Sequence, residues 1–331
     1  MDNFLDALKR FKGKKILVIG DIILDRYLYG NTNRINPEVP HAPLVNIENK
    51  EFVLGGAANV ANNLASLGAN VILFGVIGND QDGNKIKELC SKRSIVLESF
   101  TDPRRPTTLK TRIIADNHQI TRFDEEKTDE IDESLKEKIY NAIINNIDNV
   151  DCIAFSDYDK GTLTNDLSQK IIKLAKEKNI LVLTDPKPQN ISYFKGSSLI
   201  RPNHHEACKI AGMDYENGNK LELVAKKIKN IAQCKYVIIS CGKDGLFVYN
   251  SNKSVKIKAN AKEPVDVTGA GDTILAGLCL GLSSGLELHQ AAELANLMAG
   301  IVVGKVGTAT ITIEEIGKLL KKETITLNIK Q

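Results

Sequence analysis

Several features that mark other classes of protein are missing from this 331-residue sequence. No apolar run is long enough to span a membrane, and the N-terminal segment MDNFLDALKR has no apolar core of the kind that signal peptides carry. Aromatic residues make up only 5%, and no arm rich in lysine and arginine is interleaved with them. Because the net charge is only +3 and the lysines are dispersed, we expect a cytoplasmic protein that binds neither membranes nor nucleic acids.

Paired cysteine motifs are missing as well. The six cysteines form no C-x-x-C pair, and several lie in apolar segments such as DCIAF and GLCLGL. This arrangement indicates reduced, buried thiols. Hydrophobic residues make up 42% and charged residues 26%, which is typical of a soluble globular protein that can bury a sizeable core.

Short apolar runs alternate with amphipathic segments along most of the chain. The segments at 55–69 and 166–179 have the spacing of helices. The apolar runs that predict buried strands are residues 14–21, 71–78, 151–157, 180–186, 198–203 and 235–242. This order predicts a three-layer α/β fold, in which helices cover both faces of a mostly parallel central sheet.

Two regions, residues 22–50 and 104–124, interrupt this alternation. Both show polar and apolar residues in turn, with many β-branched side chains, which favours antiparallel strands that expose one face. We predict that they form one small antiparallel β-sheet that projects from the main domain. Such a sheet could serve as a lid over an active site or as a dimer surface.

The segment DVTGAGDTILAGL (266–278) places an acid where a glycine-rich turn becomes an apolar helix. Gly269 and Gly271 allow a tight turn, and its N–H groups together with the helix dipole would form a site for an anion such as a phosphoryl group. Asp272, in the first helical turn, could take the proton of an attacking hydroxyl. Alternatively, Asp272 is a helix N-cap and the glycines only form the turn, and the residues alone leave both interpretations open.

The same segment closely resembles the second signature of the PfkB (ribokinase-like) carbohydrate kinases, and GGAANVANNLASLGANVILFGVIG (55–78) resembles the first. The two signatures stand in the right order, and the resemblance covers essentially the whole chain. It implies a ribokinase-like fold, a single kinase domain over residues 1–331, and ATP and Mg²⁺ as cofactors. It also implies that Asp272 is the catalytic base and that the amides of Gly269, Ala270 and Gly271 form the anion hole.

The resemblance further implies a nucleotide site. RPNHHEA contains the N-x-x-E element that would order Mg²⁺ and the phosphates through water, and ISCGKDG (239–245) matches the turn beside the nucleotide. The implied residues are Lys187, Asn203, His204, His205, Glu206, Ser240, Gly242 and Asn296. Lys187 follows Asp185 at a strand end and could touch a phosphate or be a surface lysine, and the adjacent histidines do not predict a metal site.

A monovalent cation, with K⁺ as the candidate, is implied between Asp266, Thr268 and the loop at 305–310. Two look-alike motifs do not qualify. GNDQDGNK (78–85) lacks the lysine and the Ser/Thr of a P-loop, and GAGDTI lacks the final glycine of a dinucleotide-binding fingerprint.

A more local resemblance concerns the acceptor. The segments GDIILDRYLYGNTNRINPEVPHAPLV, RPTTLKTRII and SDYDKGTLT are similar to bacterial heptose-7-phosphate kinases. The implied acceptor-site residues are Asp25, Gly55, Gly56, Asn59, Arg105, Lys110, Arg112, Arg122, Asp157 and Lys160, with Arg34 as a further cation. Lys110 and Arg112 alternate on one strand, so they could grip one phosphate together, although a charged edge strand that prevents aggregation would look the same.

These inferences predict an ATP-dependent kinase that phosphorylates the anomeric O1 of a heptose 7-phosphate, as a homodimer formed through the lid. Two alternatives remain: a PfkB kinase for another sugar, such as ribose or a fructose phosphate, and a non-catalytic sugar-binding protein. The H-x-G-H motif of the adenylyltransferase domain found in related bifunctional enzymes is absent, so we expect no such domain within this chain. The sequence leaves open whether the chain is a stand-alone kinase or the N-terminal half of a longer enzyme.

Overall fold

The structure is a computed structural model, and the residues it describes are 2–39, 41–214, 220–251, 253–260, 266–305, 307 and 309–320. Residue 40 of the first lid region, residues 306 and 308 of the predicted cation loop, and the C-terminal segment 321–331 therefore lie outside the described residues. No helix in the described part of the chain is long and apolar enough to cross a membrane.

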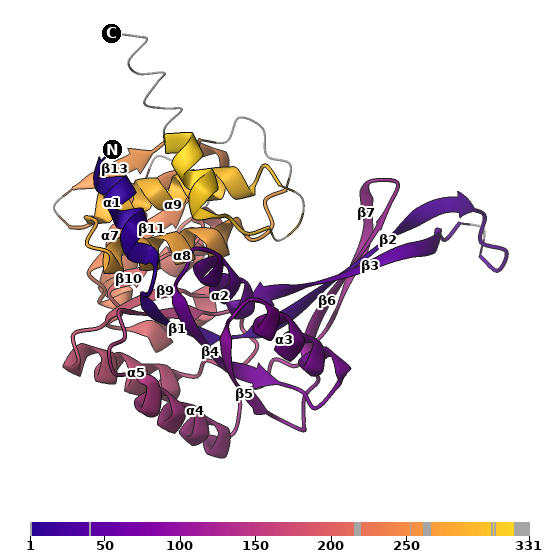
Figure 1. The fold of residues 1–331 in the computed structure, drawn as a ribbon, viewed down its shortest axis with the longest axis horizontal. Helices are drawn as coiled ribbons and strands as arrows, with labels where there is room; N and C mark the ends of the chain where they lie inside the picture. The colour runs from indigo at the N-terminus through magenta and orange to yellow at the C-terminus, as the bar shows by residue number, and fades with distance from the viewer. Residues whose placement is uncertain are drawn as a thin grey trace, which may run out of the picture.

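A nine-stranded sheet, counted over the described residues, forms the centre of the main domain (Figure 1). In spatial order its strands are β13 (Ser254–Ile257), β12 (Leu246–Tyr249), β11 (Tyr236–Ser240), β10 (Leu199–Ile200), β9 (Leu181–Asp185), β8 (Cys152–Ser156), β1 (Lys15–Gly20), β4 (Asn70–Ile77) and β5 (Val96–Thr101). Pairing is parallel from β11 to β5, and β12 pairs antiparallel with both of its neighbours. The six strands predicted from apolar runs are confirmed as β1, β4, β8, β9, β10 and β11.

Helices cover both faces of this sheet, which explains why its central strands are continuous apolar runs. Alternate residues of β1 point to opposite faces: Ile16 and Val18 join one hydrophobic core, and Leu17 and Ile19 join the other. The first core contains α1 (Asp2–Phe11), α2 (Ala57–Ser66), α3 (Gln81–Lys92), α8 (Ala270–Ser283) and α9 (Leu288–Val302). The second contains α4 (Glu133–Asn146), α5 (Asn165–Glu177), α6 (His204–Ala211) and α7 (Leu221–Ala232).

The two regions that interrupt the alternation form one four-stranded sheet, as predicted, and we call this sheet the lid. Its strands in order are β3 (Leu44–Gly56), β2 (Ile22–Arg34), β6 (Thr108–Ala115) and β7 (His118–Glu125). Each region is an antiparallel hairpin, but the central pair β2 and β6 runs parallel. The parallel pair arises because β2 follows β1 and β6 follows β5, and these two strands point the same way in the main sheet.

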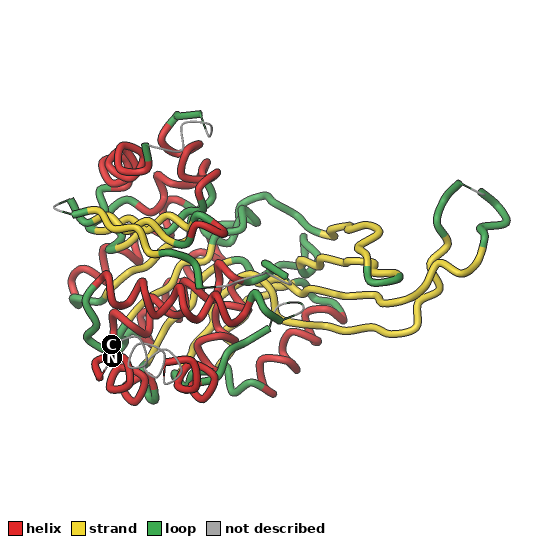
Figure 2. Tube along the Cα trace, turned by 90° about the horizontal axis from the view of Figure 1, so that it is seen from above, coloured by secondary structure: helices red, strands yellow, loops and turns green. Residues whose placement is uncertain are grey.

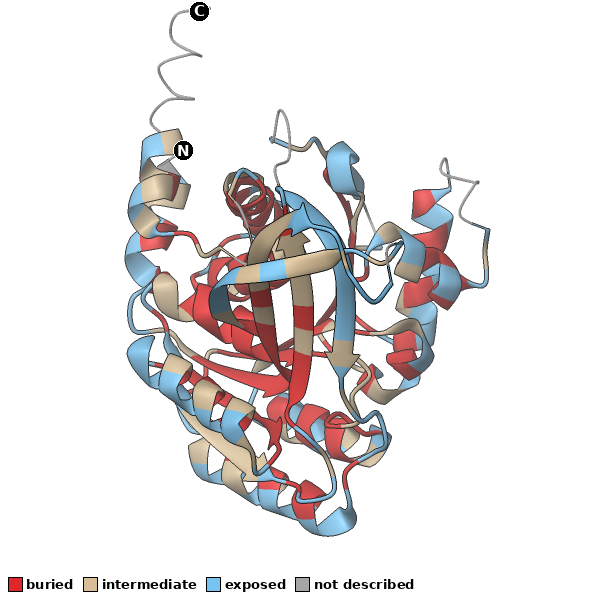
Figure 3. Ribbon diagram, turned by 90° about the vertical axis from the view of Figure 1, so that its right-hand side faces the viewer, coloured by how far each residue is buried: buried red, intermediate tan, exposed pale blue. Residues whose placement is uncertain are grey.

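The lid projects from the main domain as an arm (Figures 1 and 2). Burial decreases along β2 from its start, which lies against the main domain, to its exposed end at Arg34 (Figure 3). The return strand β3 leads directly into α2 through Gly55 and Gly56. A side chain at residue 55 would collide with the carboxylate of Asp25, and Gly56 has a φ of 56°, so the junction favours glycine at both positions.

Candidate active site

The functional candidates gather at one edge of the main sheet, where parallel strands end. Asp21 follows β1, Asp157 follows β8, and Asp185 ends β9. The helix α8, which carries Asp272 in its first turn, packs against β8 and β9. The carboxyl ends of parallel strands are the usual place for ligand sites in α/β folds.

The carboxylate of Asp272 is buried and held by two hydrogen bonds. Its side chain is only 4% exposed. Asn59 Nδ2 donates to one oxygen at 2.7 Å, and the hydroxyl of Tyr158 donates to the other at 2.9 Å. Burial raises the pKa of Asp272 to about 6, against the effect of these two hydrogen bonds. The group is therefore mostly ionised at neutral pH yet basic enough to accept a proton.

The N-cap interpretation of Asp272 does not fit this geometry. The helix α8 begins after Gly269, which is itself the N-cap residue and has a φ of 78°. No side chain caps this helix end, and Asp272 instead contacts Asn59 and Tyr158. The anion hole stays a prediction: the amide of Ala270 already donates to the carbonyl of Val267 at 3.3 Å.

Arg201 lies directly beside the glycine turn. Its buried guanidinium forms an ion pair with Asp185, and its Nη1 donates to Ser240 Oγ at 3.4 Å. A Cβ atom on Gly271 would lie 2.9 Å from the Nη2 atom of Arg201. The turn can therefore approach this cation only because residue 271 has no side chain.

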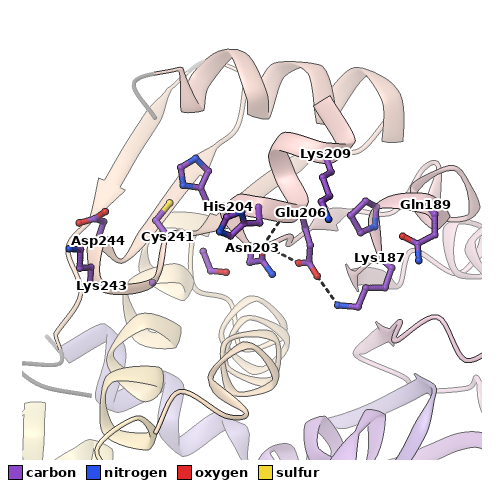
Figure 4. A pocket seen from close by; sticks show the side chains of 13 residues that line it. Lys187, Gln189, Asn203, His204, Glu206, Lys209, Cys241, Lys243 and Asp244 are labelled. Atoms are coloured by element: carbon purple, nitrogen blue, oxygen red, sulfur yellow. Dashed lines mark hydrogen bonds and ion pairs between the residues drawn. The ribbon is translucent and has the colours of Figure 1, made fainter. Parts of the chain in front are cut away.

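A cavity of about 690 Å³ opens next to Arg201, and it contains most of the predicted nucleotide-site residues (Figure 4). The predicted residues that line it are Lys187, Asn203, His204, His205, Glu206, Ser240 and Gly242. Asn296 does not line it; its side chain is buried and donates to the carbonyl of Lys258 at 2.7 Å. The structure thus brings together the strand-end lysine, the N-x-x-E element and the turn after β11.

The N-x-x-E element forms a capping box at the start of α6. Asn203 Oδ1 accepts from the amide of Glu206, and Glu206 Oε2 accepts from the amide of Asn203, both at 2.9 Å. The remaining oxygen of Glu206 accepts from Lys187 Nζ at 2.7 Å, so one carboxylate holds both the helix start and the lysine (Figure 4).

On the acceptor side, the predicted cations of the lid differ in their surroundings. Lys110 lies over the ring of Tyr158, with its Nζ 5.0 Å from the ring centroid. Arg112 pairs with Asp25 and lies over the ring of Tyr27. Paired residues of β2 and β6 share a face, so Asp25, Lys110 and Arg112 all lie on the face of the lid that meets Tyr158.

Three further predicted cations have protein partners. Arg122 pairs with Asp124, and Lys160 pairs with Glu126 at 2.6 Å. The partners of Arg105 are Asp102 and the carbonyls of Lys160 and Asp129. Its guanidinium therefore connects the loops that contain these three residues.

The predicted cation loop is partly described. Asp266 Oδ1 accepts from the amide of Thr268 at 2.8 Å, and Oδ2 accepts from the amide of Gly307 at 3.0 Å. Asp266 therefore connects the turn before α8 with the facing loop. These are the two segments between which the family resemblance implies a monovalent cation.

Residues 13–315 match the family model for pfkB family carbohydrate kinases. The chain belongs to this family. A carbohydrate kinase transfers a phosphoryl group to a sugar hydroxyl, so the protein is a phosphotransferase with an alcohol group as acceptor. Kinases of this family use ATP and a divalent metal ion.

Curated relatives match along nearly the whole chain. The bifunctional protein HldE of Sulfurimonas denitrificans is 39% identical over 330 residues, which is 98% of this chain and 69% of the relative. HldE of Aliarcobacter butzleri is 40% identical over 306 residues, which is 92% of this chain and 64% of the relative. The chain thus spans about two thirds of the length of the curated relatives it matches.

Solved structures of the same fold include two sugar kinases. Phosphofructokinase-2 from Escherichia coli in complex with potassium has a TM-score of 0.76 at 16% identity, over 93% of this chain and 97% of that one. Arabidopsis thaliana ribokinase complexed with ribose and ATP has a TM-score of 0.72 at 18% identity, over 94% and 99%. These likenesses confirm the ribokinase-like fold.

The sequence analysis missed three residues of this kinase site. Tyr158, Arg201 and Asp21 lie in segments that the motifs included, but they were not singled out. A signal was present for Arg201, because an arginine at the end of a buried strand needs a nearby acid. Tyr158 and Asp21 gave no such signal, since their partners lie far away in the sequence.

Proposed function

We propose that the protein is a cytoplasmic kinase that phosphorylates the anomeric O1 of D-glycero-β-D-manno-heptose 7-phosphate with ATP. The product would be the 1,7-bisphosphate, for synthesis of ADP-heptose and the lipopolysaccharide core. The segments that resemble heptose-7-phosphate kinases support this proposal, as does the similarity to the HldE proteins. The observation that carries it is the position of Lys110, a lid cation that lies over Tyr158, which in turn holds Asp272.

In this proposal Asp272 takes the proton from the O1 hydroxyl. A bond forms between O1 and the γ-phosphorus, the bond from that phosphorus to the β,γ-bridging oxygen breaks, and ADP leaves. The N-terminus of α8 and the guanidinium of Arg201 would supply positive potential where negative charge develops. Asn59 keeps the carboxylate in place through its 2.7 Å hydrogen bond.

On the donor side, the cavity of about 690 Å³ would hold ATP, with Lys187 toward its phosphates. Glu206 offers the carboxylate oxygens that Mg²⁺ prefers, and the described residues contain no group of three or more candidate metal ligands. This set fits a Mg²⁺ ion that is held mainly by phosphates and water. When bound, the ion would neutralise charge on the phosphate oxygens. Asp266 and Thr268 would serve a K⁺ site beside the glycine turn.

On the acceptor side, Lys110 and Arg112 would bind the phosphate that the sugar already carries. Lys110 has no ion-pair partner among the described residues, and burial lowers its pKa. An incoming phosphate dianion would raise the pKa of this lysine again. Asp25 holds Arg112 in place and would also be near the sugar hydroxyls.

The test is a turnover assay on a panel of free sugars and sugar phosphates, with the product identified by ³¹P NMR. We expect a new anomeric phosphate on heptose 7-phosphate and much weaker turnover of the other acceptors. Asp272→Asn should reduce kcat by about a hundredfold to ten-thousandfold while sugar binding is retained. Preferred turnover of ribose or a fructose phosphate would overturn the heptose assignment, and wild-type turnover by Asp272→Asn would overturn the role of the base.

A further inference from the structure

Tyr158 contacts three charged side chains, and the proposed function gives each of them a different role: the base, the acceptor side and the donor side. Its hydroxyl donates to Asp272 Oδ1 at 2.9 Å. Lys110 Nζ of the lid lies 5.0 Å from its ring centroid, and Lys187 Nζ of the ATP-side cavity lies 5.4 Å from the same centroid. One side chain therefore links the base to a cation on the acceptor side and a cation on the donor side.

The loop that carries Tyr158 is fixed by buried carboxylates. Asp21, only 1% exposed, accepts hydrogen bonds from the amides of Tyr158, Lys160 and Thr162 at 2.8, 3.1 and 3.2 Å. Asp157 accepts from the amide of Asp159 at 2.9 Å. Several backbone amides of this loop are thus held by two buried carboxyl groups, so the loop has little freedom to move Tyr158.

The ammonium groups of both lysines lie near the ring of Tyr158, which is a favourable environment for a cation. An aromatic face attracts cations through the electrostatic quadrupole of the ring. Lys187 also pairs with Glu206, whereas Lys110 has no ion-pair partner among the described residues and lies over the ring. Removing the ring would leave Lys110 without this anchor.

The hydroxyl of Tyr158 acts on the charge state of the base. Burial raises the pKa of Asp272 to about 6, and the hydrogen bonds from Asn59 and Tyr158 oppose that rise. The charged groups that face Asp272 are Asp185, which also raises its pKa, and Arg201, which lowers it. Burial and the charge of Asp272 raise the pKa of Tyr158 well above its usual value, so this hydroxyl keeps its proton and remains a donor.

We propose that Tyr158 is a positioning residue, which orients and stabilises the ionised carboxylate of Asp272 and fixes Lys110 and Lys187 on either side of the reacting centre. This proposal deepens the proposed function and rests on it in assigning Asp272 as the base. Tyr158 itself exchanges no proton with the substrate. It sets the relative position of the groups that do act on the two substrates.

The decisive variant is Tyr158→Phe, which keeps the ring and removes the hydroxyl. We expect kcat below pH 7 to fall by about tenfold, with the acid limb of the kcat–pH profile displaced upward by about one pH unit. The KM values for ATP and for the sugar phosphate should change by less than about twofold, because the ring remains. A profile with an unchanged acid limb and wild-type kcat would overturn the proposal.

A second variant separates the ring from the hydroxyl. Tyr158→Leu should also raise the KM for the sugar phosphate by about tenfold or more, since Lys110 loses the ring. The matched control is Tyr193→Phe, whose hydroxyl bonds to exposed Glu130 at 3.3 Å, and it should leave kcat, both KM values and the pH profile unchanged. Equal KM values in Tyr158→Leu and Tyr158→Phe would contradict the role of the ring.

A measurement without turnover distinguishes this proposal from the proposed function. Tyr158→Phe should lower the melting temperature more at pH 8 than at pH 5, because Asp272 is ionised at pH 8. If the wild-type protein phosphorylates no sugar but shows this pH dependence, the function is wrong and the contact to the carboxylate is supported. If the loss is the same at both pH values, the stabilisation of the carboxylate by Tyr158 is refuted whatever the substrate.

Discussion

Asp272 is a buried carboxylate, and its burial has a consequence for the stability of the fold. Burial raises its pKa from 3.8 to about 6. In the unfolded chain the same carboxyl would ionise near its ordinary value. Because the folded pKa is the higher one, ionisation of Asp272 favours the unfolded state. The resulting loss of folding stability begins as the pH rises above about 4 and is complete above about pH 6.

We therefore expect Asp272→Asn to be more stable than the wild-type protein at pH 8. The gain should grow between about pH 4 and pH 6 and level off at higher pH, and it should not exceed about 3 kcal/mol, the value of a shift of about two pKa units. Asparagine can still accept the hydrogen bond from Asn59, so the packing changes little. Thermal unfolding of both proteins across this pH range measures the effect. A difference that does not grow with pH would show that the ionised carboxylate carries no such cost.

At the scale of elements, the lid is the part of the structure that we propose to contact the acceptor. Lys110 of β6 is in register with Asp25 of β2, whereas Lys50 of β3 is in register with Leu28. Asp25 and Leu28 lie on opposite faces of the strand. The two lysines thus belong to the same sheet but face opposite sides, and Lys110 is the one on the side of Tyr158.

This difference supplies a matched pair of variants. Lys110→Met keeps the length of the side chain and removes its charge, so we expect the KM for the phosphorylated acceptor to rise by about tenfold or more. The KM for ATP should change much less. Lys50→Met is the control and should behave like the wild-type enzyme in steady-state kinetics. Equal increases in both KM values for Lys110→Met would argue against a grip on the acceptor phosphate.

The elements also show how far sequence reasoning reaches. The strands β1 and β8 were predictable because both of their faces are buried, which makes them continuous apolar runs. The lid was predictable from its alternating pattern. The parallel pairing of β2 with β6 was not, since no local pattern records which hairpins meet. It follows from where β1 and β5 lie in the main sheet.

The same limit applies to the site. Asp272 and Asn59 were predicted from two motifs, although 213 residues separate them in the sequence. Tyr158 contacts Asp272 across 114 residues, and it was missed because its own segment gave no sign of that partner. Motifs predicted candidate groups for the site, and the folded chain was needed to show which residues contact those groups.

At the scale of the whole molecule, large hydrophobic side chains are exposed on the lid and on the loop that joins β2 to β3. Ile120 and Phe123 belong to β7, and Ile35 and Val39 belong to the loop. Exposed apolar groups can mark a surface that another protein covers. We propose that this surface pairs with a second copy of the chain, which would make the protein a homodimer.

Light scattering coupled to size-exclusion chromatography tests this proposal. The wild-type protein should elute with twice the mass of one chain, and the double variant Ile120→Ser/Phe123→Ser should shift toward the monomer. Val96→Ser is the control, because Val96 is 55% exposed on the edge strand β5 of the main sheet, away from the lid. Its mass should match that of the wild type. A monomeric wild-type protein, or a double variant that stays dimeric, would exclude these side chains as the dimer contact.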